Sequence, residues 1–223
     1  MAIWQYQLNI IPKKSIIEKY GELPEKLFID FDGWENYWKN RTSGDGFPEP
    51  KFEDAKTIKW WLKTNLNIEK IAKQFDLYVK RGDWSDDDSG FIGWKGNSEL
   101  NEDNDAHISY NKETKIISEF QFRTDLRTKE NLDKFLRGIL KICADNELMV
   151  FNTKGYLFEP DFQIIIADLK KSNAAAFLTD PVKFLDKLAE KNNEANLKEK
   201  ASLEKQINLK EDSFWFKIKS LFK

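Results

Sequence analysis

The amino-acid sequence opens with a regular alternation of apolar and polar side chains. Between residues 2 and 10 the odd positions mostly carry amides and the even positions are apolar: Trp4, Tyr6, Leu8 and Ile10. A period of two with aromatic and β-branched residues is typical of a strand that buries one face. We therefore predict a strand here that ends at Pro12.

A short helix is expected after this strand. The stretch SIIEKYG has Ser15 and Glu18 at capping-box spacing and Gly21 where a left-handed C-terminal residue belongs. Longer helices are indicated where apolar residues recur every three or four positions. The first such stripe is Ile68, Ile71, Ala72, Phe75 and Val79, and the second, over residues 128–145, is Leu132, Phe135, Leu136, Ile139, Leu140 and Cys143.

The stretch DAHISYNKETKIISEFQFRTDLR, residues 105–127, is typical of a β-hairpin. Its apolar side chains share one face only when even-numbered residues pair with even-numbered ones. That pairing requires a bulged turn, which we predict with Thr114 in the left-handed conformation. The resulting register places His107 opposite Glu119.

Together these elements predict an α+β fold, in which a mainly antiparallel sheet packs against amphipathic helices. A second hairpin is expected over residues 147–160. A helix is then expected after Asp180 and Pro181, with an inward stripe of Val182, Leu185, Leu188 and Ala189. Beyond residue 190 the chain is rich in charge and poor in apolar residues. We therefore predict a single domain over residues 1–190 and a charged helical extension over residues 191–223.

The region of residues 32–66 shows no period and is expected to be a long loop. It contains Trp34, Trp38, Trp60 and Trp61 around the glycine- and proline-rich stretch RTSGDGFPEP. A loop of this length in a compact domain is usually either functional or ordered by its own aromatic residues. Trp34 and Trp38 are therefore candidate partner-binding residues.

Composition argues against a dedicated nucleic-acid-binding protein. The net charge is −2, whereas such proteins normally have an excess of basic residues. Of the 223 residues 40% are hydrophobic, which is enough to form a core. The N-terminus lacks the basic leader and apolar block of a signal peptide, and no apolar run reaches the ~18 residues that span a bilayer. Cys143 is the only cysteine, so no internal disulfide forms. We expect a cytoplasmic protein without a cofactor and without nucleic acid as a partner.

The stretch RGDWSDDDSGFIGWKG, residues 81–96, lies in the most acidic part of the chain. Residues 83–105 hold eight carboxylates against one lysine, a local charge of −7. An EF-hand loop needs glycine at its sixth position and glutamate at its twelfth. With Gly90 at the sixth position the twelfth is Gly96, and a loop that starts at Asp83 has Asp88 at the sixth and Trp94 at the twelfth. The remaining interpretations are a solvated turn and a surface that attracts a basic protein. The candidate partner-binding residues are Asp83, Asp86, Asp87 and Asp88.

A second candidate site lies on the polar face of the predicted hairpin. Arg123, Asp125 and Arg127 stand two apart in FRTDLR, and arginine suits carboxylate and phosphate ligands. With His107 they form an alternative site for anion binding or acid–base catalysis. The competing interpretation is a network of surface charges that compensate one another. A single histidine cannot build a His-based metal cluster, so no metal site is predicted.

The chain ends in an amphipathic stretch, SFWFKIKSLFK. On a helical wheel its apolar residues fall within about 120° of arc, with lysines on the remainder. This apolar face could pack against the preceding domain of the same chain, bind a partner protein, or make a weak peripheral contact with an anionic membrane surface. The candidate partner-binding residues are Phe214, Trp215 and Phe222.

Several stretches resemble small cytosolic bacterial proteins of uncharacterised or immunity type: WQYQLNIIPKKSIIEKYGELPEKL, ISEFQFRTDLR, and SNAAAFLTDP with KFLDKLAE. Members of this class are often encoded beside polymorphic toxins and neutralise them by direct binding. The resemblance implies a non-enzymatic α+β protein that acts through a surface, and it carries over no site residues. We therefore expect a protein-binding module, an immunity-type inhibitor of a basic partner. The alternatives are an anion-binding protein or enzyme, and a scaffold anchored by its tail.

Overall fold

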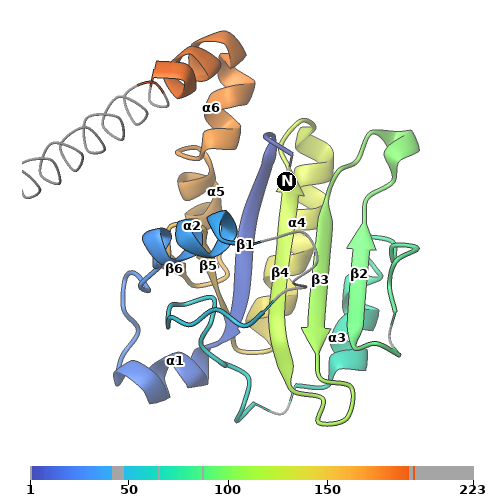
Figure 1. Ribbon diagram of the computed structural model, residues 1–223. Coiled ribbons are helices and arrows are strands. Elements are labelled where there is room, and N and C mark those ends of the chain that lie inside the picture. The colour runs from blue at the N-terminus through green and yellow to red at the C-terminus, as the bar shows by residue number, and fades with distance from the viewer. Residues whose placement is uncertain (1, 42–47, 65, 87, 191–192, 194–223) are drawn as a thin grey trace, which may run out of the picture. The chain divides into compact units, whose positions relative to one another are not determined.

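The computed structural model describes residues 2–41, 48–64, 66–86, 88–190 and 193. These residues have an α+β fold built on a six-stranded antiparallel sheet (Figure 1), which confirms the predicted fold class. The sheet order is β2-β3-β4-β1-β5-β6. The strands are β1 (Gln5–Pro12), β2 (Phe91–Lys95), β3 (Asp105–Tyr110), β4 (Ile117–Asp125), β5 (Leu148–Asn152) and β6 (Leu157–Phe158).

The helices follow the predicted stripes where those exist. They are α1 (Lys13–Tyr20), α2 (Phe31–Lys39), α3 (Ile68–Phe75), the 3-10 helix η1 (Ser98–Leu100), α4 (Lys129–Asp145), α5 (Phe162–Leu169) and α6 (Asn173–Thr179). The chain divides into two compact units, Met1–Ala175 and Ala176–Lys223. In the second unit residues 181–190 are helical, and the Asp180 carboxylate caps this helix by accepting a hydrogen bond from the Lys183 N–H at 3.0 Å.

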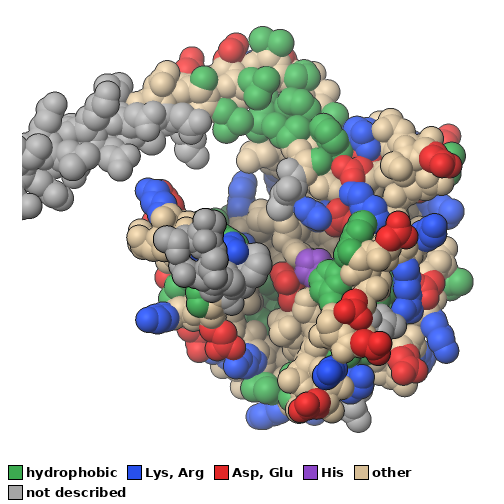
Figure 2. Space-filling model, turned by 45° about the vertical axis from the view of Figure 1, so that its right-hand side comes forward, with side chains coloured by type: hydrophobic (Ala, Val, Ile, Leu, Met, Phe, Trp, Pro, Cys, Tyr) green, Lys and Arg blue, Asp and Glu red, His purple; other side chains and the backbone are tan. Residues whose placement is uncertain are grey.

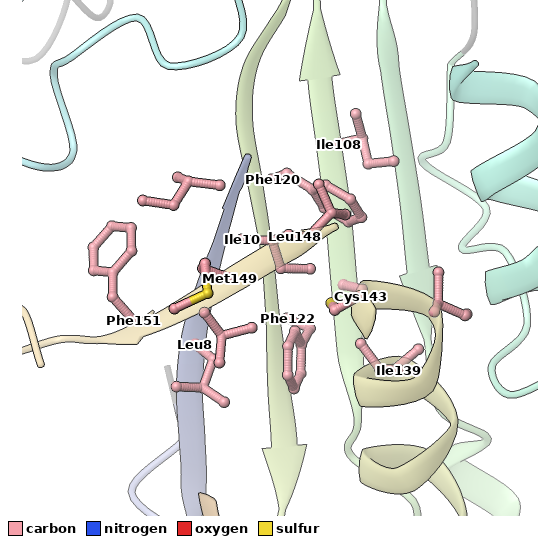
Figure 3. Close-up of a cluster of buried hydrophobic side chains, with 14 of the residues drawn as sticks. Leu8, Ile10, Ile108, Phe120, Phe122, Ile139, Cys143, Leu148, Met149 and Phe151 are labelled. Carbon is pink, nitrogen blue, oxygen red and sulfur yellow. The ribbon is translucent and has the colours of Figure 1, made fainter. Parts of the chain in front are cut away.

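The main hydrophobic core lies between one face of the sheet and helix α4, which Figure 1 shows behind the strands. Even-numbered side chains of β1 and β4 point into it, including Leu8, Ile10 and Phe122, and all three are almost completely buried. Figure 3 shows them facing Ile139 and Cys143 of α4. Burying large apolar side chains contributes about 1.5–3 kcal/mol each, so this layer is the main source of stability.

The opposite face of the sheet is covered over only part of its area. Odd-numbered residues of β1 and β5 are apolar and buried at one end, among them Ile11, Met149 and Phe151. Helix α2 and residues 48–64 lie on this side of the sheet (Figure 1). The remaining area carries polar side chains on odd-numbered positions of β1, β4 and β3, whereas β2 contributes the Phe91 ring and Gly93.

Both edges of the sheet are paired with additional chain. Along β2, the backbone N–H groups of Gly82 and Lys95 donate to the carbonyls of Gly93 and Lys80 at 2.9 Å each. Beside β6, the Leu157 N–H donates to the Glu25 carbonyl at 3.0 Å. Neither outer strand therefore offers a continuous row of unpaired backbone groups.

The predicted hairpin forms, but its register differs by two residues. His107 pairs with Gln121 rather than with Glu119; even pairs with even over residues 105–109, whereas Tyr110 pairs with Ile117. One residue of the difference comes from the turn, in which Lys115 rather than Thr114 is left-handed, with a φ of 55°. The other comes from a register shift between Ser109 and Tyr110.

Three other expectations are corrected. Helix α1 begins at Lys13, so Ser15 lies inside it and the capping box does not form, whereas Gly21 is left-handed as predicted. Residues 32–66 are not all loop, because α2 runs through Lys39. The side chains expected to face inward after Pro181 are exposed instead: Val182 by 70%, Leu185 by 52% and Leu188 by 37%.

Candidate functional site

The uncovered part of the sheet face forms the floor of the candidate site. Three polar side chains on neighbouring strands lie in a row: Gln7 on β1, Gln121 on β4 and His107 on β3. The Gln7 amide donates to the Gln121 carbonyl oxygen, and Gln121 Nε2 lies 3.2 Å from His107 Nε2. Figure 2 shows this face, with the histidine in purple inside a hollow of the surface.

His107 is the centre of this floor. Its Nε2 lies 3.0 Å from the Glu119 carboxylate as well as 3.2 Å from the Gln121 amide, and its ring stacks on Phe91 with centroids 5.5 Å apart. One imidazole nitrogen therefore faces both an acceptor and an amide, so its protonation decides which of the two it bonds. No described residue bonds its other nitrogen, Nδ1.

Neighbouring groups favour the ionised form of the Glu119 carboxylate. Burial acts to raise the pKa of Glu119, but the hydrogen bond from His107 and the positive charges of His107 and Lys56 lower that pKa below its usual value. Desolvation lowers the pKa of Lys56, and the carboxylates of Asp54 and Glu119 oppose that shift. Lys56 thus links the sheet face electrostatically to the segment around Asp54.

One rim of this face is an aromatic cluster on α2 and the segment after it, which lie on this side of the sheet (Figure 1). Trp34 stacks on Trp38 at 6.4 Å between centroids and meets Phe52 edge-on at 5.2 Å. The Trp34 indole donates to the buried Asp54 carboxylate at 2.7 Å, and Lys56 lies 5.5 Å from the Trp34 ring. Both tryptophans that the sequence singles out therefore belong to one cluster, with Trp38 53% exposed.

The opposite rim is the acidic turn, defined here by its described residues 83–86 and 88. The Asp86 carboxylate accepts from the N–H groups of Asp88 and Ser89 at 3.1 and 3.3 Å, and Asp86 bridges to Phe91 at the start of β2. Asp83, Asp86 and Asp88 are exposed and form no ion pair with another described residue. Asp87 lies outside the described residues. Of the described carboxylates in this turn, those of Asp83, Asp86 and Asp88 therefore have no cation paired with them among the described residues.

The arginines of the alternative site are already paired. Arg123 donates to the buried Asp105 carboxylate at 2.6 Å, which Lys95 also approaches at 3.7 Å. Arg127 lies beyond the end of β4, so it does not share a strand face with Arg123. It holds the fully buried Asp125 at 2.7 Å. These contacts fit the self-compensating network better than a site for a free anion.

A second role of Arg127 is structural. Its guanidinium donates to the Asn101 side chain and backbone at 2.9 and 3.1 Å, and it lies 4.8 Å from the centre of the Trp4 ring. The Asp103 N–H also donates to Asp125 at 2.9 Å. Together these bonds fasten the connection between β2 and β3 to the end of β4.

The structure brings His107 and Glu119 together between the two rims, and adds residues that sequence reasoning missed. These are Gln7, Asp54, Lys56, Phe91 and Gln121. The amides on the odd positions of β1 and β4 are visible as a polar alternation, but nothing in the sequence pairs those strands. Phe214, Trp215 and Phe222 lie outside the described residues.

Among the described residues, no helix has the length and apolar character needed to cross a membrane. No protein-family model, curated protein or solved structure matches this chain.

Proposed function

We propose that this protein is a non-enzymatic protein-binding module, an immunity-type inhibitor that engages its partner through the hollow face of the sheet. The observation that carries the proposal is the exposed aromatic cluster of α2, which stands on a fixed base beside an open polar floor. An inhibitor needs a preformed surface, because ordering a surface upon binding costs affinity.

The aromatic cluster has the character of an interface. None of the residues of α2 is buried, and Phe31 and Trp38 are 56% and 53% exposed. Phe28, just before the helix, is 64% exposed. Exposed aromatic side chains next to one another are typical of binding sites, and tryptophan is among the residues that most often dominate binding energy.

Charge supports a basic partner. Asp83, Asp86 and Asp88 of the acidic turn form no ion pair with another described residue, whereas Arg123 and Arg127 are paired with carboxylates. Uncompensated charge at a rim accelerates encounter with an oppositely charged protein and weakens as salt is added. The two rims thus supply different parts of binding: aromatic area for affinity and carboxylates for steering.

The alternative is an enzyme or anion-binding protein that uses His107. Its open Nδ1 beside the hollow is the observation in favour, since a histidine held by a carboxylate is a common general base. Against it stands the pairing of Arg123 with Asp105, which leaves this cation unavailable for an anionic substrate. We therefore rank it second.

The test is capture from lysate of the native host by the immobilised full-length protein, with quantification by mass spectrometry. We expect one stoichiometric protein whose recovery falls roughly tenfold or more with Trp38→Ala, as at a binding hot spot. Leu77→Ala, at a side chain that is 73% exposed elsewhere, is the matched control and leaves recovery unchanged. Equal recovery of the partner with the Trp38→Ala and Leu77→Ala proteins would exclude the aromatic cluster from the binding interface.

Two further arms assign the remaining elements. Asp83→Lys combined with Asp88→Lys reverses the charge of two carboxylates that accept no hydrogen bond from another described residue. We expect the double variant to associate with the partner more slowly and with a weaker dependence on salt. A chain of residues 1–190 tests the tail. Full recovery with that chain removes Phe214, Trp215 and Phe222 from the interface.

A further inference from the structure

We infer that the aromatic row Trp84, Phe91 and His107, together with the Glu119 carboxylate, receives an arginine side chain of the protein partner. This inference rests on the proposed function and names the chemistry that the sheet face selects. The partner's contact segment is therefore arginine-bearing rather than basic in general.

The row is continuous because Gly93 has no side chain. A Cβ at Gly93 would lie 2.5 Å from Trp84 Nε1 and 3.0 Å from Phe91 Cε1, so both rings border the same strand position. The Phe91 ring then stacks on His107 at 5.5 Å, with 29° between the planes. Trp84 is 54% exposed, which leaves ring surface for a ligand.

A carboxylate stands at the His107 end of this row. Glu119 lies 3.0 Å from His107, and its side chain is 53% exposed. The backbone of Asp86 pairs with that of Phe91, the middle residue of the row. A cation bound at the row therefore has aromatic side chains and the Glu119 carboxylate as neighbours.

This pairing of ring and carboxylate suits arginine more than lysine. The guanidinium is planar, stacks on aromatic faces and still donates hydrogen bonds in its plane, whereas an ammonium is a compact and strongly hydrated charge. The protein itself contains such an arrangement, because Arg127 lies 4.8 Å from the Trp4 ring centre while it holds Asp125 at 2.7 Å. The same geometry is thus stable in this fold.

The experiment titrates the isotope-labelled full-length protein with three short peptides at fixed ionic strength, and follows the tryptophan indole N–H signals by NMR. The peptides alternate glycine with arginine, with lysine or with citrulline. Citrulline keeps the planar shape of arginine but has no charge. We expect the Trp84 signal, assigned with Trp84→Phe, to shift with arginine most, with lysine less and with citrulline least.

Variants locate the site. Phe91→Leu keeps an apolar strand residue but removes the ring, and should weaken arginine-peptide binding by roughly 3- to 10-fold, as expected for loss of one cation–π contact. Glu119→Gln should also weaken binding, whereas Glu113→Gln, at an exposed carboxylate in the β3–β4 turn, should not. If circular dichroism shows that Phe91→Leu is unfolded, Trp84→Leu replaces it.

Equal binding of the arginine and citrulline peptides would overturn the inference, as would unchanged affinity in a folded Phe91→Leu or Trp84→Leu protein. Failure here is distinct from failure of the proposed function. If a partner is captured through Trp38 but the row shows no preference for arginine, the proposed protein-binding function stands and only this inference fails. If the row binds the arginine peptide but no partner is captured, this inference stands and the proposed function fails.

Discussion

The indole N–H of Trp34 donates a 2.7 Å hydrogen bond to the carboxylate of Asp54, which is only 1% exposed. The same carboxylate accepts from the backbone N–H groups of Asp30, Lys56 and Thr57 at 3.2, 2.8 and 3.1 Å. One aspartate thus joins the start of α2, the aromatic cluster and the segment beside β4.

We predict that Asp54→Ala destabilises the protein by about 3 kcal/mol, because it leaves several donors without an acceptor. Trp34→Phe keeps the ring and loses one of these bonds, so it should cost about 1 kcal/mol. Urea unfolding followed by tryptophan fluorescence measures both. Equal losses in the two variants would mean that the carboxylate does not organise this region.

Asp125 should give the fold a defined acid sensitivity. Burial acts to raise the pKa of Asp125, but hydrogen bonds from Arg127 and from the Asp103 N–H, with the charge of Arg127, lower it below the usual value. The unfolded state therefore binds the proton more readily. The stabilisation is present above about pH 4 and is lost as pH falls through the folded-state pKa.

The variant Asp125→Asn tests this linkage. We expect it to lose roughly 2 kcal/mol at pH 7, as for a hydrogen bond to a charged group, and to lose less of its stability than the wild type as pH is lowered from 5 to 2. Unfolding free energies across that pH range provide the measurement. Parallel pH curves for the two proteins would contradict the assignment.

Two left-handed glycines should respond differently to alanine. Gly90 has a φ of +83°, and a Cβ there would lie 2.1 Å from the Tyr110 carbonyl oxygen, whereas Gly21 has a φ of +80° with nothing within 4 Å. Gly21→Ala should cost roughly 1–2 kcal/mol for its backbone conformation alone. Gly90→Ala should cost about 3 kcal/mol or more, because the clash adds to that cost. Thermal unfolding compares them, and similar losses would rule out the close approach.

Thr124 offers a stabilising substitution. Its side chain is fully buried on the core face of β4, and its Oγ1 has no hydrogen-bond partner among the described residues. Thr124→Val keeps the branched shape and removes the unsatisfied hydroxyl, so we expect a gain of about 1 kcal/mol. A loss of stability in urea would indicate that the hydroxyl has a partner, such as a bound water.

Cys143 should be inert in the folded protein. The side chain is completely buried on α4, and burial raises the pKa of its thiol well above the usual range. The reactive thiolate is therefore scarce, and reagents cannot reach it. We expect modification by a thiol-specific reagent to occur only at the rate of unfolding, and to become fast in denaturant. Fast reaction in native buffer would contradict the position of this residue.

The sequence supports prediction of the elements with periodic patterns. The stripes of α3 and α4 match buried positions, because these helices pack on the core. The even-numbered residues of β1 are buried as its alternation predicts, but Gln5, Asn9 and Ile11 are buried as well, so the prediction of a single buried face was wrong. Helix α2 has no such stripe, since none of its residues is buried. Its start depends instead on Asp30, whose carboxylate accepts from the Gly33 N–H at 2.8 Å.

The candidate site was predictable only in parts. Trp34, Trp38 and the acidic turn stand out locally as clusters of one residue type. The floor does not, because Gln7 and Gln121 are 114 positions apart and meet only where β1 inserts between β4 and β5. Such non-local strand pairing leaves no periodic signal in either segment. The His107–Glu119 contact emerged from a wrong register, since the two residues meet diagonally rather than in direct opposition.

The pairing of both outer strands with neighbouring chain has a consequence for evolution. These pairings leave the outer strands no continuous row of free backbone groups for strand addition, a mode of recognition that tolerates many sequences. Under the proposed function, recognition would instead use individual side chains on the open face. Single substitutions there can change which partner is bound without disturbing the framework beneath, so a lineage of such proteins would be able to follow a changing target residue by residue.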